Sequence, residues 1–238
     1  MKKTCRTQLF FSILAFCGGF LDIFSFINRG GFSLMQTGNI IYSTIYFING
    51  NIQYAAYCIT LIFSFFTCLV ISNLLKRKID NVHKFRKISF LIAAVILLIC
   101  IFIPIDFQYS NVLPFQVKKT FLNLIGNILL SAVGAFIYNS TLNSYKVSIT
   151  TTMMTANLGR LANSIFSEKK NIGFYVITIL SFIAGLVSSY FIICAIGNNY
   201  LLSNNYIDSL IYNLPLLITL FGLIVCKFLY CDDQFFDK

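Results

Sequence analysis

The sequence predicts an all-α, polytopic transmembrane helical bundle with six spans and two short re-entrant half-helices in an inverted repeat. Three observations support this prediction. Hydrophobic residues make up 58% of the 238 residues and charged residues only 11%, whereas a soluble domain is about 45–50% apolar and about 25% charged. The mean hydropathy is +0.80, and the apolar residues gather in long runs. A soluble domain, a disordered chain and a coiled coil are therefore excluded, and residues 1–238 should form a single integral membrane domain.

Six apolar segments are long enough to span a bilayer, which takes about 17–25 residues. They are Leu9–Ile27, Tyr54–Leu75, Ile88–Ile105, Phe121–Tyr138, Ile172–Ile196 and Ile211–Tyr230. The first follows three basic residues, as the apolar run of a signal peptide does, but it continues to Ile27 with no small-x-small cleavage site after it. We expect it to be an uncleaved first span.

The basic residues set the topology, because Lys and Arg near the ends of spans resist translocation. One cluster precedes the first span, and a second lies between Tyr54–Leu75 and Ile88–Ile105. Both should be cytoplasmic, so an even number of crossings separates them. The short apolar segment Thr37–Ile48 between them therefore does not cross. As a helix it would be only about 18 Å long, whereas the hydrocarbon core is about 30 Å thick.

A second short segment, Thr151–Phe166, has basic residues on both sides, with Lys146 before it and Lys169 and Lys170 after it. It should also enter and leave the membrane on the cytoplasmic side. The segment Gly197–Ser209 contains no Lys or Arg and is predicted to be external. Both termini are then cytoplasmic, and only three basic residues fall outside: Arg29, Lys118 and Lys119.

The two short segments resemble each other, which indicates an internal repeat. The first begins Met35-Gln36-Thr37-Gly38-Asn39 and the second Met153-Met154-Thr155-Ala156-Asn157. Each follows a glycine-containing span and precedes two further spans, so the repeat halves are about 9–105 and 121–230. Three spans per half invert the second copy relative to the first, as in many transporters and channels. The short helices would enter from opposite sides and meet near the midplane, where Thr37 and Thr155 would cap them.

Three motifs form a recognisable set: Gly19-Phe20-Leu21-Asp22, then Gln36-Thr37-Gly38-Asn39, then Thr151-Thr152 with Thr155-Ala156-Asn157. The set resembles the YoaK family, which comprises bacterial six-span membrane proteins with a domain of unknown function that are sometimes described as small permeases. The resemblance covers about Leu9 to Tyr230. It implies a multi-pass protein of the bacterial cytoplasmic (inner) membrane and no known substrate. Where the family often has Gln-Asn-Ala, Asn139 matches and Tyr138 does not, and Ala156 replaces a glycine.

Asp22 is the most informative candidate residue, because a carboxylate at membrane depth costs about 2.5–3.5 kcal/mol even on the lenient insertion scale. One interpretation is a proton or cation site, or a counter-ion. The other is a structural hydrogen bond to N–H groups of a loop or half-helix.

Polar residues on the two short helices are the other candidates for a substrate pathway. They are Gln36, Thr37, Asn39, Thr155 and Asn157, and they either line a solute path with hydroxyls and amides or only pin the short helices. Arg160 either faces that path, pairs with Asp22, or extends to the cytoplasmic surface. Asn139 lies roughly where Asp22 lies in the other half. Asn123 and Asn127 share one helix face and should bond between helices.

The leading functional prediction is a channel or secondary transporter for a small polar or anionic solute. The alternative is a non-transport membrane scaffold or assembly factor. No enzyme, cofactor or metal site is expected, because the eight cysteines form no C-x-x-C pair and the single histidine, His83, has no metal partner nearby in sequence. The net charge of +10 reflects topology rather than nucleic-acid binding. The expected partners are the lipid bilayer and a small solute, and a homo-oligomer is left open.

Overall fold

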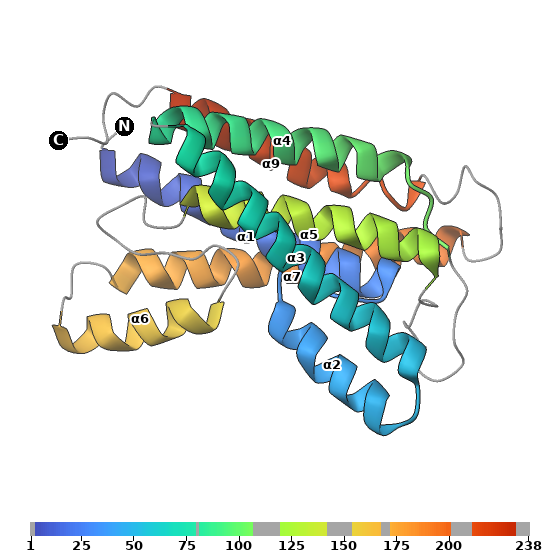
Figure 1. The fold of residues 1–238 in the computed structure, drawn as a ribbon. Helices are drawn as coiled ribbons and strands as arrows, with labels where there is room; N and C mark the ends of the chain where they lie inside the picture. The colour runs from blue at the N-terminus through green and yellow to red at the C-terminus, as the bar shows by residue number, and fades with distance from the viewer. Residues whose placement is uncertain are drawn as a thin grey trace.

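The computed structural model describes residues 3–79, 81–106, 120–141, 154–167, 172–200 and 211–231, and all regular secondary structure there is helical. The helices are α1 (Lys3–Arg29), α2 (Gln36–Ile48), α3 (Ile52–Lys78), α4 (Val82–Phe102), α5 (Phe121–Thr141), α6 (Met154–Ser167), α7 (Ile172–Tyr200) and α9 (Leu216–Cys231). Figure 1 shows the long helices lying side by side as a bundle, with the start of α1 and the end of α9 at the same end. This confirms the prediction of a helical membrane bundle.

Five helices are long and apolar enough to cross a membrane: α1, α3, α4, α5 and α7. The sixth predicted span corresponds to α9, whose apolar part, Leu216–Leu229, is shorter. It begins later than the predicted Ile211, because residues 212–215 form turns. Pro215 explains this difference, since proline has no backbone N–H and disfavours helical backbone in the residue before it.

The short helices α2 and α6 each occupy only part of the length of the bundle. The chain leaves α1 through Gly30, whose φ of 79° is a conformation that glycine adopts without steric cost. It then runs back to the start of α2, which ends beside the start of α3, and α6 likewise ends near the start of α7 (Figure 1). The 13 residues of α2 match the predicted Thr37–Ile48 within one residue. The segment before Met154 lies outside the described residues.

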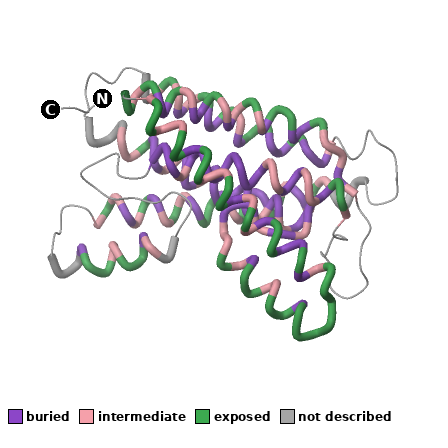
Figure 2. The backbone as a smooth tube through the Cα atoms, viewed as in Figure 1, coloured by how far each residue is buried: buried purple, intermediate pink, exposed green. Residues whose placement is uncertain are grey.

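The two central helices are α1 and α5. In the most apolar stretch of α1, 72% of the residues are buried, and in that of α5, 61% are buried. The corresponding share is 22% in both α3 and α7. Figure 2 shows the same contrast, with α2 and the outer faces of the bundle largely exposed. Large exposed side chains on these faces are apolar, including Phe63, Phe66, Phe191 and Phe221. Apolar surface of this extent is what a lipid-facing bundle presents.

The most extensive helix pairing is between α1 and α7. It depends on one glycine in each helix, Gly19 in α1 and Gly185 in α7, and each lies against the backbone of the other helix. A Cβ at Gly19 would overlap the carbonyl oxygen of Phe182, and a Cβ at Gly185 would overlap that of Phe16. Small residues let the backbones of two membrane helices approach this closely. The remaining major pairings are α3 with α5, α4 with α5, α2 with α3, α1 with α9, α4 with α9, and α6 with α7.

Candidate functional site

Asp22 lies in α1 and is completely buried, with 0% of its surface exposed. Its Oδ1 accepts hydrogen bonds from the backbone N–H groups of Leu34 at 2.8 Å and Met35 at 3.1 Å. These two residues belong to the loop that leads into α2. The other carboxylate oxygen, Oδ2, is buried and has no hydrogen-bond partner. Asp22 therefore holds the loop with one oxygen and keeps an unused acceptor on the other.

Asn39 fixes the same loop from the α2 side. Its Oδ1 accepts from the Phe32 N–H at 3.0 Å, and its Nδ2 donates to the Phe32 carbonyl at 2.8 Å and to Gln36 Oε1 at 2.9 Å. The Gln36 amide in turn donates to the carbonyl of Ser33 at 2.9 Å. The structure thus gathers three predicted site residues, Asp22, Gln36 and Asn39, around the loop of residues 30–35.

Thr37 does not cap α2, and that prediction was wrong. The helix begins at Gln36, its N-cap is Met35, and no side chain makes a capping hydrogen bond. Thr37 is an exposed residue of the first turn. A capping side chain belongs to the residue just before the helix, whereas Thr37 follows the first helical residue, Gln36.

On the second short helix, Asn157 is completely buried, and its Oδ1 accepts from Arg160 Nη1 at 3.2 Å. This bond joins positions i and i+3 on one helix face. Thr155 lies in the first turn of α6, but its side chain is outside the described part of the chain. Among the described residues no ion pair joins Arg160 to Asp22, whose Oδ1 receives backbone N–H groups instead.

Asn139 belongs to a different cluster, between α3, α4 and α5. Its Nδ2 donates to Ser72 Oγ at 3.0 Å, and the guanidinium of Arg86 donates through Nε to the carbonyl of Ser140 at 3.0 Å. The structure therefore does not bring Asn139 into the group formed by Asp22 and Asn39.

Arg29, at the end of α1, is a buried charged residue that the sequence interpretation missed. It is 0% exposed. Its Nη2 donates to the carbonyls of Cys100 at 3.4 Å and Ile103 at 3.0 Å and to Asn213 Oδ1 at 3.1 Å. Its Nε and Nη1 have no hydrogen-bond partner. No carboxylate of the described residues forms an ion pair with it. The carbonyls are the last of α4, so the cation also compensates a helix C-terminus.

The surroundings of Arg29 are built to hold it in place. Gly126 of α5 leaves the room that the guanidinium fills, since a Cβ there would overlap it. The hydroxyl of Tyr57 donates to the carbonyl of Arg29, and Asn127 Nδ2 donates to the Gly31 carbonyl at 2.9 Å. Asn123 pairs with the backbone of Asp106 through two hydrogen bonds, at 3.0 and 3.1 Å. Asn127 also donates to the Tyr57 hydroxyl of α3 at 3.5 Å, a bond between helices as predicted, whereas Asn123 bonds to the segment that follows α4.

One signal in the sequence could have identified Arg29. It lies seven residues after Asp22, so the two share a face of α1, and it precedes the Gly30-Gly31 pair at which the chain reverses. The topology rule assigned it to an external loop, because that rule considers only distance along the chain from the end of a span.

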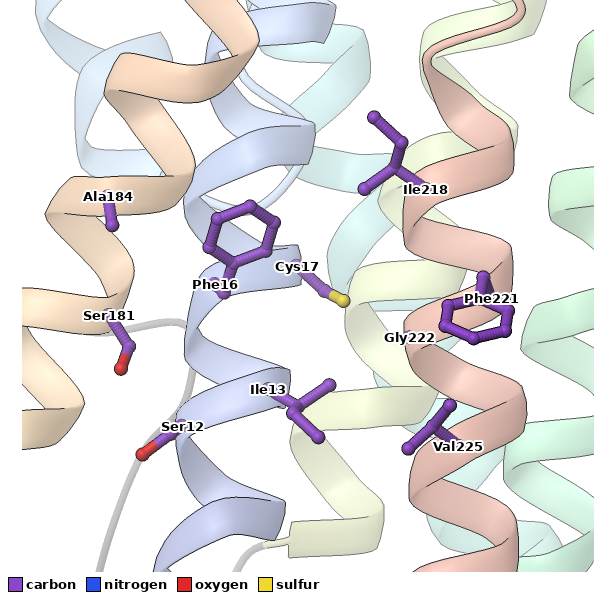
Figure 3. A pocket seen from close by; sticks show the side chains of 10 residues that line it. All are labelled: Ser12, Ile13, Phe16, Cys17, Ser181, Ala184, Ile218, Phe221, Gly222 and Val225. Carbon is purple, nitrogen blue, oxygen red and sulfur yellow. The ribbon is translucent and has the colours of Figure 1, made fainter.

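An open cavity of about 390 Å³ lies between α1, α7 and α9, away from these polar groups. It is lined by Ser12, Ile13, Phe16, Cys17, Ser181, Ala184, Ile218, Phe221, Gly222 and Val225 (Figure 3). None of the predicted pathway residues lines it. Within the described residues, no three His, Cys, Asp or Glu side chains are grouped as a metal site, and six cysteines are free thiols.

Long apolar helices, an exterior rich in large apolar side chains and polar clusters buried between the helices together define a polytopic helical membrane protein. Residues 10–204 match the family model described as "Protein of unknown function (DUF1275)". The chain belongs to this family, which includes the YoaK proteins, so the resemblance in its motifs is confirmed. No curated protein matches the chain, and no solved structure matches it.

Proposed function

We propose that the protein is a channel or secondary transporter for a small polar or anionic solute. One observation carries this proposal: two charged side chains on α1 are fully buried and keep unused hydrogen-bonding atoms, Oδ2 of Asp22 and Nε and Nη1 of Arg29. A buried polar group without a partner costs about 1–3 kcal/mol, and a charged one more. Ionisable groups retained inside a membrane at such a cost mark substrate or ion pathways.

The chemistry of the two groups favours an anion as the solute. The guanidinium of Arg29 offers N–H donors suited to a carboxylate or another small oxyanion. Asp22 lies two turns away on the same face of α1, about 10.5 Å along the axis. A carboxylate at that distance can exchange a proton while the solute binds at Arg29, which is the arrangement that proton-coupled transport needs.

The pattern of helix contacts supports six spans in an inverted repeat. Exchanging α1 with α5, α2 with α6, α3 with α7 and α4 with α9 maps the contacts onto one another. The α1–α7 pair becomes α5–α3, the α4–α5 pair becomes α9–α1, and α2–α3 becomes α6–α7. The exchange also maps the two most buried spans onto each other and the two least buried onto each other. Inverted repeats of this kind are common in secondary transporters.

The proposed topology places both termini in the bacterial cytoplasm. Single cysteines at Val82 and Asn51, in a background without the native cysteines, test it with a membrane-impermeant thiol reagent. Both positions are exposed and flank α3 at opposite ends. Asn51 should be labelled in intact cells and Val82 only after permeabilisation. Labelling of Val82 from outside would overturn the orientation.

Flux into proteoliposomes tests the transport activity. The solutes are chloride, nitrate and acetate, with potassium and glycerol as comparisons, measured for the wild type and for Arg29→Gln, Arg29→Lys and Asp22→Asn. Arg29→Gln should abolish anion flux, and Arg29→Lys should retain part of it. Lys84→Gln is the control, because Lys84 is exposed at the start of α4 and should leave flux unchanged.

The scaffold alternative rests on the hydrogen bonds that fix the loop before α2, namely those of Asp22 and Asn39. In this interpretation Asp22 and Asn39 serve only to hold the loop before α2 in place. If the folded wild type carries no flux of any of the five solutes, the transport proposal is overturned and the scaffold interpretation stands.

A further inference from the structure

We propose that the cavity between α1, α7 and α9 is a binding site for one acyl chain of a phospholipid, in the leaflet on the side of the two termini. This site is separate from the solute pathway, and nothing in the proposed transport activity requires it.

The shape and depth of the cavity fit an acyl chain. Its α9 wall runs from Ile218 to Val225, a length of about 10 Å, and its α1 wall from Ser12 to Cys17. Figure 3 shows Ile13 and Cys17 pointing from α1 toward α9, and Ser12 and Ser181 on the side of the cavity toward α7. A volume of about 390 Å³ lies within the range of about 300–1,000 Å³ that holds small-molecule ligands.

The lining excludes a polar solute. Apart from Ser12 and Ser181, the walls are aliphatic, aromatic or thiol groups, and a free thiol behaves as a small hydrophobe. Water in such a space would have too few polar partners. The cavity is open, and Ala184 and Phe221 on its rim are exposed. Because α1 and α7 are membrane spans, the surroundings at that rim are lipid chains.

Ser12 adds an observation that favours a phospholipid over a plain hydrocarbon. Its Oγ is buried and has no hydrogen-bond partner, although a helical serine can bond to the carbonyl four residues earlier. Ser12 lies five residues, about 7.5 Å, from the start of the apolar part of α1 at Thr7. That depth is close to the interface, where lipid ester carbonyls lie. The hydroxyl can donate to such a carbonyl while the chain fills the cavity below it.

Gly222 keeps the cavity open on the α9 side. A Cβ there would lie 2.5 Å from the Sγ of Cys17 and 3.4 Å from a methyl of Ile13. Any larger residue would occupy the space between α1 and α9. Ala184 faces the cavity from α7 (Figure 3) and is exposed, so it can be enlarged without burying the new side chain in the core.

Native mass spectrometry of the whole protein in detergent, with added phosphatidylglycerol bearing palmitoyl and oleoyl chains, tests the site. The wild type should retain one lipid per chain. Ala184→Phe should lower this retention by about tenfold or more, because its ring occupies the cavity. Ile183→Phe is the matched control. It adds a ring at the neighbouring exposed position, which does not line the cavity, and should retain lipid as the wild type does.

The ether-linked analogue of the same lipid tests the role of Ser12. Removing the ester carbonyl or introducing Ser12→Ala should each lower retention about threefold, the size of an average hydrogen bond between membrane groups. The two changes together should lower it no further. Equal retention by the Ala184→Phe and Ile183→Phe variants would overturn the proposal. So would a wild type that retains no lipid, or one that forms a dimer which Ala184→Phe disrupts, since a second copy would then occupy the groove.

Discussion

The two halves of the molecule, α1–α4 and α5–α9, share their packing pattern but differ in their polar groups. Asp22 in the first half accepts backbone N–H groups from a loop, whereas Asn139, its approximate counterpart, donates to a side chain of α3. Both buried charges of the proposed pathway, Asp22 and Arg29, lie on α1. In the proposed repeat the two halves would therefore share their architecture, and the charged residues of the proposed pathway would belong to the first half alone.

The largest effect should come from blocking the α1–α7 contact. Gly19→Leu or Gly185→Leu would drive a side chain into the facing backbone and should prevent folding, since overpacking costs about 1–3 kcal/mol even where neighbours can shift. The yield of monodisperse protein in detergent measures this. Gly173→Leu is the control. Gly173 is also in α7, and a Cβ there would have no neighbouring atom within 4 Å.

The equivalent pair α3–α5 is built differently, because α3 contains no glycine. If Gly19→Leu folded as well as Gly173→Leu, the close approach of α1 and α7 would not be required. The close glycine contact would then no longer distinguish the α1–α7 pair from the α3–α5 pair.

The next largest effect concerns the loop before α2. Asp22→Ala removes the acceptor for Leu34 and Met35 and should destabilise the protein by about 1–3 kcal/mol. Asp22→Asn keeps an acceptor oxygen and should cost much less. Thermal unfolding measures both, and hydrogen exchange at Leu34 and Met35 reports the loop itself. Equal losses in the two variants would show that the charge, rather than the hydrogen bonds, stabilises the loop.

In the second half, Asn139→Ala should cost about 0.6 kcal/mol and at most about 1.7 kcal/mol, the range measured for side-chain hydrogen bonds in membrane bundles. A double-mutant cycle with Ser72→Ala isolates the pair. An additive result would mean that Asn139 and Ser72 do not interact, and a loss as large as that of Asp22→Ala would remove the proposed asymmetry.

Thr37→Ala should give the smallest change in stability, within about 0.5 kcal/mol, because Thr37 is exposed and caps nothing. Its effect on anion flux is therefore a clean test of whether it lines a pathway. Reduced flux with unchanged unfolding temperature would support that role, and unchanged flux would exclude it.

Five of the six predicted spans correspond to helices that are long and apolar enough to cross a membrane, because the length of an apolar run decides a span. Residues 37–48 are predicted to form a short helix from the length of their apolar run and from the basic clusters on either side, and α2 has that extent within one residue. Arg29 and the cavity could not be predicted in this way. Arg29 is fixed by Cys100, Ile103 and Asn213, which lie far from it in the chain. The cavity forms only where three helices meet, which are far apart in the chain. Thr37 is not a cap because α2 already begins at Gln36, so that Thr37 is a residue of the first turn.

The contacts among the helices have a consequence for biogenesis. The first helix packs mainly on α7, and α3 and α4 pack on α5, whereas α3 and α4 contact each other only slightly. A nascent chain that has inserted only its first half therefore holds the α2–α3 pair, but the main partners of α1 and α4 have not yet been synthesised. The half-made protein must persist in the bilayer as loosely associated helices. Truncated chains ending after α4 should consequently be cleared by membrane proteases rather than accumulate.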